Sequence, residues 1–323
     1  MKLQTQVPLM PSKNRIDYTS RLLVLGSCFA THIGAKLRYY KFQSVQNPFG
    51  ILFHPKAIER LILRAIQREP YTENDLFFRN EQWHCFDAHS DMSDTHKERL
   101  LENLNTQLQH TFQQCATATH IVISIGTAWV YRHKAFNQWV ANCHKVPQSE
   151  FTKELLNIEE IENSISRIIE AIRNMNPAVH FIGTVSPVRH LKDGFVENQR
   201  SKAHIISALH HIVQQAHFSE VVSYFESYEI MMDELRDYRF YAEDMVHPNR
   251  LAVAYIWEKF KKSWISEPSY PIMEVVDGIQ KGLNHRPFHA ESEAYQTFKK
   301  GIAQKISNLK EDYPFMDFQG SGM

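Results

Sequence analysis

Short apolar segments alternate with amphipathic helical patterns up to about residue 225, and this alternation constrains the fold more than any other feature. Apolar runs of this length are typical of strands that are buried on both faces. Strands that alternate with helices predict an α/β fold with a doubly wound, flavodoxin-like parallel sheet, here of five strands. The predicted strands are residues 22–25, a segment that ends at residues 47–50, and residues 120–125, 179–185 and 221–225.

Two segments interrupt the alternation and are predicted to be inserted β-hairpins. The first occupies about residues 71–90, with Asn80-Glu81 at its turn, and the second occupies about residues 129–147. A long helix is expected from about residue 151 to 175. Pro248 is expected to begin the last helix that covers the sheet.

The C-terminal part of the chain is expected to form an extension that packs on the main α/β unit. We divide the chain into a unit of residues 1–264 and a helical extension of residues 265–323. Residues 265–288 contain prolines and show no clear period, which predicts irregular structure. The pattern from Tyr295 to Leu309 predicts an amphipathic helix, and the end from about Glu311 is expected to be loosely ordered.

The composition excludes several classes of partner. Hydrophobic residues make up 43% and charged residues 22%, which is ordinary for a globular protein. Lys plus Arg equals Asp plus Glu, 36 each, so no excess of charge points to nucleic acid or a membrane. No C-x-x-C pair, signal-peptide core, apolar run of about 18 residues or metal-ligand spacing of histidines is visible. We therefore expect a cytoplasmic protein without metal or cofactor, and nothing indicates its oligomeric state.

Candidate site residues follow the ends of four predicted strands. Ser27 comes after the first strand, Gly50 after the second, Thr127 after the third, and residues 186–190 after the fourth. The carboxyl ends of parallel strands meet at one edge of a sheet, where ligands bind, so these residues are expected to share one rim. Ser27 has two interpretations: its hydroxyl projects past the sheet, or it only caps the helix that follows.

A carboxylate and an imidazole lie close together near the other end of the main unit. Asp244 and His247 are three residues apart in a loop that precedes a predicted helix. This spacing lets the carboxylate reach Nδ1 of the ring while Nε2 faces outward. A serine hydroxyl is a weak nucleophile at neutral pH and needs such a base, so a pairing with Ser27 would complete a nucleophilic site.

Other side chains near the rim are candidates for substrate binding. His89 follows the first hairpin and could close over the rim, although packing within the hairpin is an alternative. Arg189 and His190 suit an anion or a sugar hydroxyl, and a salt bridge that holds the 191–200 loop is the alternative. Cys28, beside Ser27, is expected to be buried rather than nucleophilic.

The sequence G-S-C-F-A at residues 26–30 resembles the signature of the GSCFA-domain family, a bacterial group placed in the SGNH (GDSL-like) hydrolase superfamily. The resemblance implies a three-layer αβα fold with a parallel sheet. It also implies a Ser-His-Asp hydrolase site of the esterase or carbohydrate-deacetylase type. Further stretches that resemble the family are residues 47–50, 126–129, 186–190 and 244–247, and the whole covers roughly residues 20–260.

The resemblance also implies an oxyanion hole, from which the sequence departs at one position. In the superfamily the hole is formed by the N–H of the nucleophile, a Gly after the second strand and an Asn after the third. Ser27 and Gly50 match the first two, but Ala128 stands where the Asn is expected. The loss of one donor can cost about two to three orders of magnitude in rate. Either Thr127, Asn47 or a further backbone N–H substitutes, or the enzyme is slow, or it no longer hydrolyses anything. Asn47 is also a candidate for substrate binding.

The expected function is that of a serine hydrolase that removes an acyl group, such as acetyl, from a small polar substrate such as a sugar or a cell-wall precursor. Ser27 matches the superfamily nucleophile, His247 the base and Asp244 the acid that orients it. An O-acyltransferase on the same residues is one alternative, because pocket access decides between water and an alcohol as acceptor. A non-catalytic binding protein on a decayed hydrolase fold is another, which Ala128 favours.

Overall fold

The computed structural model describes residues 4–318 and contains a five-stranded sheet in which all neighbouring strands are parallel. This confirms the predicted sheet. Its strands are β1 (Arg21–Gly26), β2 (Gln43–Gln46), β5 (His120–Ile125), β9 (His180–Val185) and β10 (Val222–Phe225). They lie in the order β10-β9-β5-β1-β2, which is the flavodoxin-like order.

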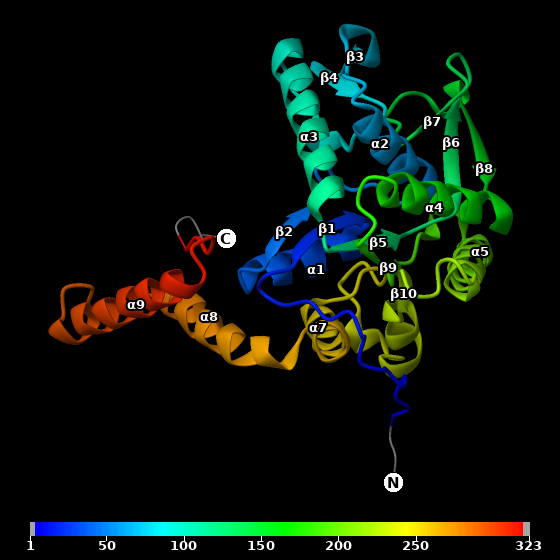
Figure 1. Cartoon of the computed structure of the whole chain (residues 1–323). Coiled ribbons are helices and arrows are strands. Elements are labelled where there is room, and N and C mark those ends of the chain that lie inside the picture. Colours follow the sequence, from blue (N-terminus) through cyan, green and yellow to red (C-terminus); the bar gives the residue numbers. More distant parts are fainter. Residues whose placement is uncertain (1–3, 319–323) are drawn as a thin grey trace.

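Helices cover both faces of this sheet and complete a three-layer arrangement (Figure 1). One layer contains α2 (Pro55–Gln67), α3 (Lys97–Thr117), α4 (Ile158–Arg173) and α5 (Phe195–Gln214), and the other contains α1 (Cys28–Tyr39), α7 (Arg250–Trp264) and α8 (Tyr270–Leu283). Leu23 and Leu25 pack toward the first layer, and Leu22 and Val24 pack toward the second. Successive residues of β1 thus face opposite layers, which explains its unbroken apolar run.

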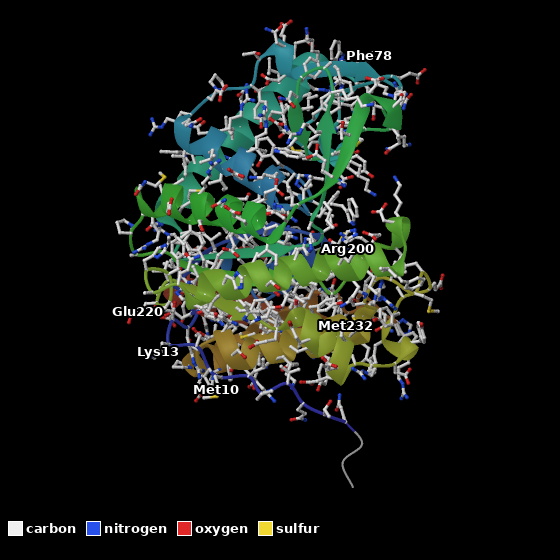
Figure 2. All side chains as sticks on the ribbon, turned by 90° about the vertical axis from the view of Figure 1, so that its right-hand side faces the viewer. Met10, Lys13, Phe78, Arg200, Glu220 and Met232 are labelled. Carbon is white, nitrogen blue, oxygen red and sulfur yellow. The ribbon has the colours of Figure 1, made fainter. Side chains whose placement is uncertain are left out.

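Both predicted hairpins are present. β3 (Leu76–Arg79) pairs with β4 (Gln82–Cys85) around Asn80 and Glu81, which both have positive φ, as a two-residue hairpin turn requires. Phe78 lies at the outer end of this hairpin (Figure 2) and is exposed. β6 (Trp129–His133) and β7 (Gln138–Val140) form the second hairpin, and β8 (Phe151–Leu155) joins it to complete an antiparallel sheet of three strands.

The expected helix start at about residue 151 was wrong. Residues 151–155 form β8, which pairs with β6, and α4 begins only at Ile158. Asn157 and Glu160 form a capping box there, each side chain accepting from the other residue's backbone N–H. A non-local strand pairing therefore replaces what looked like the first turn of a helix. The last covering helix likewise begins at Arg250, capped by Asn249 rather than opened by Pro248.

The C-terminal extension is more ordered than the sequence suggested. Residues 270–283 form α8, with Pro271 in its first turn, so the prediction of irregular structure over 265–288 was wrong there. The predicted amphipathic helix is present as α9 (Glu293–Asp312). Met316 and Phe318 are buried, so the expected loose end was wrong up to residue 318, and residues 319–323 lie outside the described range.

The extension is attached to the main unit through the C-terminal end of α1. The Tyr39 hydroxyl donates to Asp277 of α8 at 2.8 Å, and the Gln280 amide donates to the Tyr39 carbonyl at 2.9 Å. α9 folds back antiparallel to α8, with Ile302 close to Gly282 near the end of α8 and Leu309 near Pro271 at its start (Figure 1). Ile302 and Leu309 are the buried residues of α9. The division into residues 1–264 and 265–323 stays a prediction.

Candidate active site

The turn after β1 is built on a close backbone contact. Gly26 has a φ of 126°, and a Cβ atom at this position would lie 2.0 Å from the carbonyl oxygen of Ser124 on β5. Glycine is therefore required both by the backbone angle and by the neighbouring strand. Ser27 follows in an extended conformation and caps α1, accepting a hydrogen bond from the Phe29 N–H at 3.2 Å. Ser27 therefore caps α1, and the role of its hydroxyl as a nucleophile stays a prediction.

The side chain of Ser27 also contacts the adjacent strand. Its hydroxyl shares a 2.9 Å hydrogen bond with the hydroxyl of Ser124, and Ser27 as a whole is only 2% exposed. The Ser27 N–H donates to the Ser124 carbonyl at 2.9 Å. Ser124 was not a candidate in the sequence, because only the register between β1 and β5 brings it to Ser27.

Asn47 holds the same turn from the other side. Its Oδ1 accepts from the Gly26 N–H at 2.8 Å, and its Nδ2 donates to the Thr31 hydroxyl on α1 at 3.2 Å. Asn47 has a φ of 39°, in the left-handed region that asparagine tolerates better than most residues. These contacts assign Asn47 to the support of the β1–α1 turn, since both ends of its amide are engaged.

The contact expected between Asp244 and His247 is present. Oδ2 of Asp244 accepts from Nδ1 of His247 at 2.6 Å, and Oδ1 accepts from the N–H groups of Val246 and His247 at 2.9 and 3.0 Å. The backbone N–H groups of His247 and Val246, followed by the imidazole, lower the pKa of Asp244 to about 2. Because a carboxylate can only accept, Nδ1 carries the proton and the lone pair of Nε2 is left available.

The Asp244–His247 loop lies against the carboxyl edge of the sheet. The Arg189 N–H, which follows β9, donates to the Val246 carbonyl at 3.3 Å. His247 is also close enough to influence two other imidazoles. Burial, with a further contribution from His247, lowers the pKa of His32 on α1. Burial, followed by the charges of Lys202 and His247, lowers the pKa of His190 to about 4. The loop therefore approaches both α1 and the segment after β9.

The Ser27 hydroxyl is not bonded to His247. Within residues 4–318, its hydrogen-bond partners are Ser124 and Phe29. His247 and Asp244 are therefore hydrogen-bonded directly to each other, whereas Ser27 is connected to them only through neighbouring elements of the fold. Cys28, next to Ser27, is partly buried, and burial raises the pKa of its thiol, which disfavours the thiolate that a cysteine nucleophile needs.

The three N–H groups expected to hold an oxyanion already have acceptors. Besides the bond from Ser27, the Gly50 N–H donates to the Asn47 carbonyl at 2.8 Å and the Thr127 N–H donates to the Phe53 carbonyl at 3.1 Å. Gly50 has a φ of 71°, and a Cβ atom there would lie 2.4 Å from Cβ of His89. His89 therefore packs directly against Gly50. This contact is compatible both with closure of His89 over the rim and with packing within the hairpin.

A cavity of about 240 Å³ opens next to Thr127 and His190. The ammonium of Lys153 lies 4.8 Å from the ring centre of Trp129 and forms an ion pair with Asp193. Other residues in the cavity wall are Phe53, His54, Tyr131, Val140, Asn142, Cys143 and Lys192. The second inserted sheet and the loop after β9 thus form a mixed aromatic and polar pocket beside the rim.

Within the described residues, Arg189 does not form the salt bridge that was the alternative for it, and its role in binding an anion or a sugar hydroxyl stays a prediction. Its guanidinium lies 5.1 Å from the ring centre of Tyr241, and within residues 4–318 it forms no ion pair. The ring of His190 packs against Gly126 at the end of β5, so closely that a Cβ atom on Gly126 would lie 2.9 Å from its Nε2. This Nε2 has no hydrogen-bond partner among the described residues.

Lys202 is a buried residue that the sequence did not single out. Its ammonium donates to the carbonyls of Gly126 and Ser186, both at 2.7 Å, and so ties the ends of β5 and β9 together. Burial lowers the pKa of Lys202 to about 7, whereas the two carbonyl acceptors favour the charged form. Its position in the helical pattern of α5 looks like that of any polar residue, so only the tertiary structure reveals it.

The fold and this rim define a doubly wound α/β protein with a serine, an imidazole and a carboxylate near the carboxyl ends of its strands. The GSCFA family model matches residues 21–260, and a model for the C-terminal domain of GSCFA domain proteins matches residues 276–320. The chain belongs to the GSCFA family. No curated protein matched the sequence. In the described part of the chain, no helix is both long and apolar enough to cross a membrane.

We expect Gly26→Ala to destabilise the protein by at least about 2 kcal/mol, because it combines an unfavourable φ with a backbone clash at Ser124. Urea unfolding measures the change. Gly278→Ala in α8 is the matched control, since a Cβ there meets nothing within 4 Å and alanine favours a helix. Equal stability of the two variants would contradict the close contact between β1 and β5.

We expect the stability of the wild type, relative to Lys202→Met, to rise with pH from about 7 toward the ordinary lysine pKa of 10.5. In this window the unfolded state binds more protons than the folded state, so the slope is at most about 1.4 kcal/mol per pH unit. Urea unfolding at several pH values measures it, and Lys262→Met at an exposed lysine controls for the loss of a charge. A constant difference would show that the two carbonyls keep Lys202 charged.

Proposed function

We propose that this protein is a serine hydrolase of the SGNH type, which removes an acyl group such as acetyl from a polar, carbohydrate-like substrate. The observation that carries the proposal is the 2.6 Å hydrogen bond between Asp244 and Nδ1 of His247, in a loop that lies on the segment after β9. This pair supplies the base and the orienting acid that a serine nucleophile needs. Family membership and the position of Ser27 after β1 support the same assignment.

In the proposed mechanism, Nε2 of His247 takes the proton of Ser27 while the serine oxygen attacks the ester carbonyl. Asp244 keeps the proton on Nδ1 and stabilises the imidazolium. His247 then protonates the leaving alcohol, and water releases the acyl group from Ser27 by the same route. For the first step the Ser27 hydroxyl must turn away from Ser124, its partner in the free protein.

The proposed oxyanion donors are the N–H groups of Ser27, Gly50 and Thr127. Each now donates to a backbone carbonyl, so an oxyanion would have to compete with a neutral acceptor. A full negative charge makes it the stronger acceptor of the two. Ala128 offers no side-chain donor, and its own N–H donates to the Ser201 hydroxyl at 2.7 Å.

The cavity beside Thr127 and His190 is the proposed place for the polar part of the substrate. Trp129 and Tyr131 offer ring surfaces, and Lys153 and Asn142 offer donors. Burial lowers the pKa of His190 to about 4, so its ring is neutral at pH 7 and can accept from or donate to a sugar hydroxyl.

A non-catalytic binding protein is the competing proposal. It is favoured by Ala128 in place of the expected Asn and by the engagement of all three backbone N–H groups. Such a protein would keep the cavity and the Asp244–His247 loop but would turn over no ester.

We expect a fluorophosphonate probe to label the wild type and Ser219→Ala, but not Ser27→Ala. Ser219 is an exposed serine outside the rim, so its variant controls for probe chemistry and folding. Mass spectrometry of the labelled peptide identifies the modified residue. Unlabelled, folded wild-type protein would favour the binding protein.

We expect Asp244→Asn to lower kcat/KM for p-nitrophenyl acetate by roughly 10³- to 10⁴-fold, because an amide no longer fixes the proton on Nδ1 of His247. With its pKa at about 2, Asp244 stays ionised at every practical assay pH, so its own titration adds no limb to the pH profile of the wild type. Asp237→Asn is the matched control, since Asp237 is also a loop aspartate and is paired with Arg239. Unchanged kinetics in Asp244→Asn would rule out the proposed role of this pair.

A further inference from the structure

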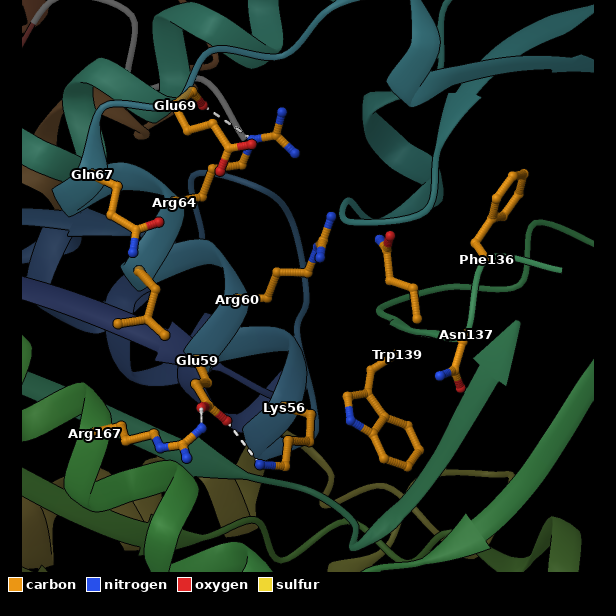
Figure 3. Close-up of a pocket in the computed structure, with 12 residues that line it drawn as sticks. Lys56, Glu59, Arg60, Arg64, Gln67, Glu69, Phe136, Asn137, Trp139 and Arg167 are labelled. Atoms are coloured by element: carbon orange, nitrogen blue, oxygen red, sulfur yellow. Dashed lines mark hydrogen bonds and ion pairs between the residues drawn. The ribbon is translucent and has the colours of Figure 1, made fainter. Parts of the chain in front are cut away.

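A second and larger cavity lies on the other side of strand β7 from the one beside the rim. It has a volume of about 550 Å³ and is bounded by α2, by Arg167 of α4 and by the β6–β7 hairpin (Figure 3). Trp139 of β7 lines this cavity, whereas the next residue, Val140, lines the smaller one. Gln138 of β7 also lines the larger cavity, so the strand separates the two cavities between Trp139 and Val140. The proposed acyl chemistry makes no use of the larger one.

Positive charge predominates in the wall of the larger cavity. Lys56, Arg60, Arg64 and Arg167 line it together with two carboxylates, of which Glu59 is buried. Glu59 is already paired with Lys56 at 2.9 Å and with Arg167 at 3.2 Å. On the α2 side, the positive charge that Glu59 does not neutralise therefore comes from Arg60 and Arg64.

The two arginines of α2 differ in how many of their donors are engaged. Arg64 is buried and donates to the Glu69 carbonyl through Nε and to Asp75 through both terminal nitrogens. Arg60 donates through Nε to the buried Asp87 at 2.6 Å. Both terminal nitrogens of Arg60 have no partner among residues 4–318, and its side chain is 35% exposed. Asp87 therefore engages Nε of Arg60, and the two terminal nitrogens of the guanidinium remain available to a ligand.

The opposite wall carries aromatic and amide groups. Figure 3 shows Arg60 extending from α2 toward the wall that holds Phe136 and Trp139. Arg132 stacks on Trp139, 3.8 Å from its ring centre, and donates to Oδ1 of Asn137 at 3.1 Å. Arg132 thus contacts both Trp139 and the hairpin turn, and Nδ2 of Asn137 has no hydrogen-bond partner in the described part of the chain.

We infer that this cavity is a binding site for a sugar residue that bears a carboxylate. The free edge of the Arg60 guanidinium matches the planar, two-oxygen geometry of a carboxylate. Trp139 offers the apolar surface on which the C–H face of a sugar ring packs, and Asn137 offers a donor for its hydroxyls. Lys56 and Arg167 add positive potential at the margin. A cavity of this volume is in the usual range for small ligands.

The test is a ligand-observed NMR titration of the full chain with D-glucuronate, carried out in Ser27→Ala so that turnover plays no part. D-glucose and acetate are the comparison ligands, one without the charge and the other without the ring. We expect D-glucuronate to bind at least tenfold more tightly than either. Equal binding of acetate would show a simple anion site and overturn the inference, as would the absence of D-glucuronate binding.

Three variants locate the site. Arg60→Gln should weaken D-glucuronate binding at least tenfold, and Arg167→Gln should weaken it severalfold. Arg60→Gln removes the Arg60–Asp87 pair and could for that reason unfold the protein. Arg167 is 66% exposed, so Arg167→Gln should fold in either case. Arg200→Gln is the control, because Arg200 lies on the surface of α5 (Figure 2) and, among residues 4–318, its ion pair is with Glu197. Binding that is unchanged in Arg60→Gln and Arg167→Gln would place the sugar elsewhere and overturn the inference.

Discussion

The placement of Ser27 depends on the contact between the backbone of Gly26 and the Ser124 carbonyl of the next strand. Only glycine fits there, so β1 can end against β5 and turn at once into α1. The turn is then held by Asn47, which accepts from the Gly26 N–H, and by the hydrogen bond between the hydroxyls of Ser27 and Ser124. The serine is thus fixed by backbone sterics on one side and by polar contacts on two others.

The same contacts explain the resting state of the proposed site. Ser27 satisfies its hydroxyl and its N–H with Ser124, and the Asp244–His247 pair satisfies itself. Lys202 fixes the carbonyls of Gly126 and Ser186, which follow two neighbouring strands. These polar groups at the strand ends therefore have partners in the free protein, whereas the buried Nε2 of His190 has none among the described residues. Catalysis would exchange some of these partners for those of the substrate.

The sequence predicted the features that depend on local patterns. The unbroken apolar run of β1 reports a strand buried on both faces, and the D-x-x-H spacing reports a contact within one short loop. It did not predict β8, because residues 151–155 become a strand only through pairing with β6. Ser124 and Lys202 were missed for the same reason, since strand register and burial by other elements give them their roles.

The attachment of the C-terminal extension places it and the serine on one helix. α1 carries Ser27 at its N-cap, while its last turn is bonded to α8 through Tyr39. The 12 residues of α1 span about 18 Å. A substitution that weakens the contacts of Tyr39 with Asp277 and Gln280 would therefore act on the same helix that positions the proposed nucleophile.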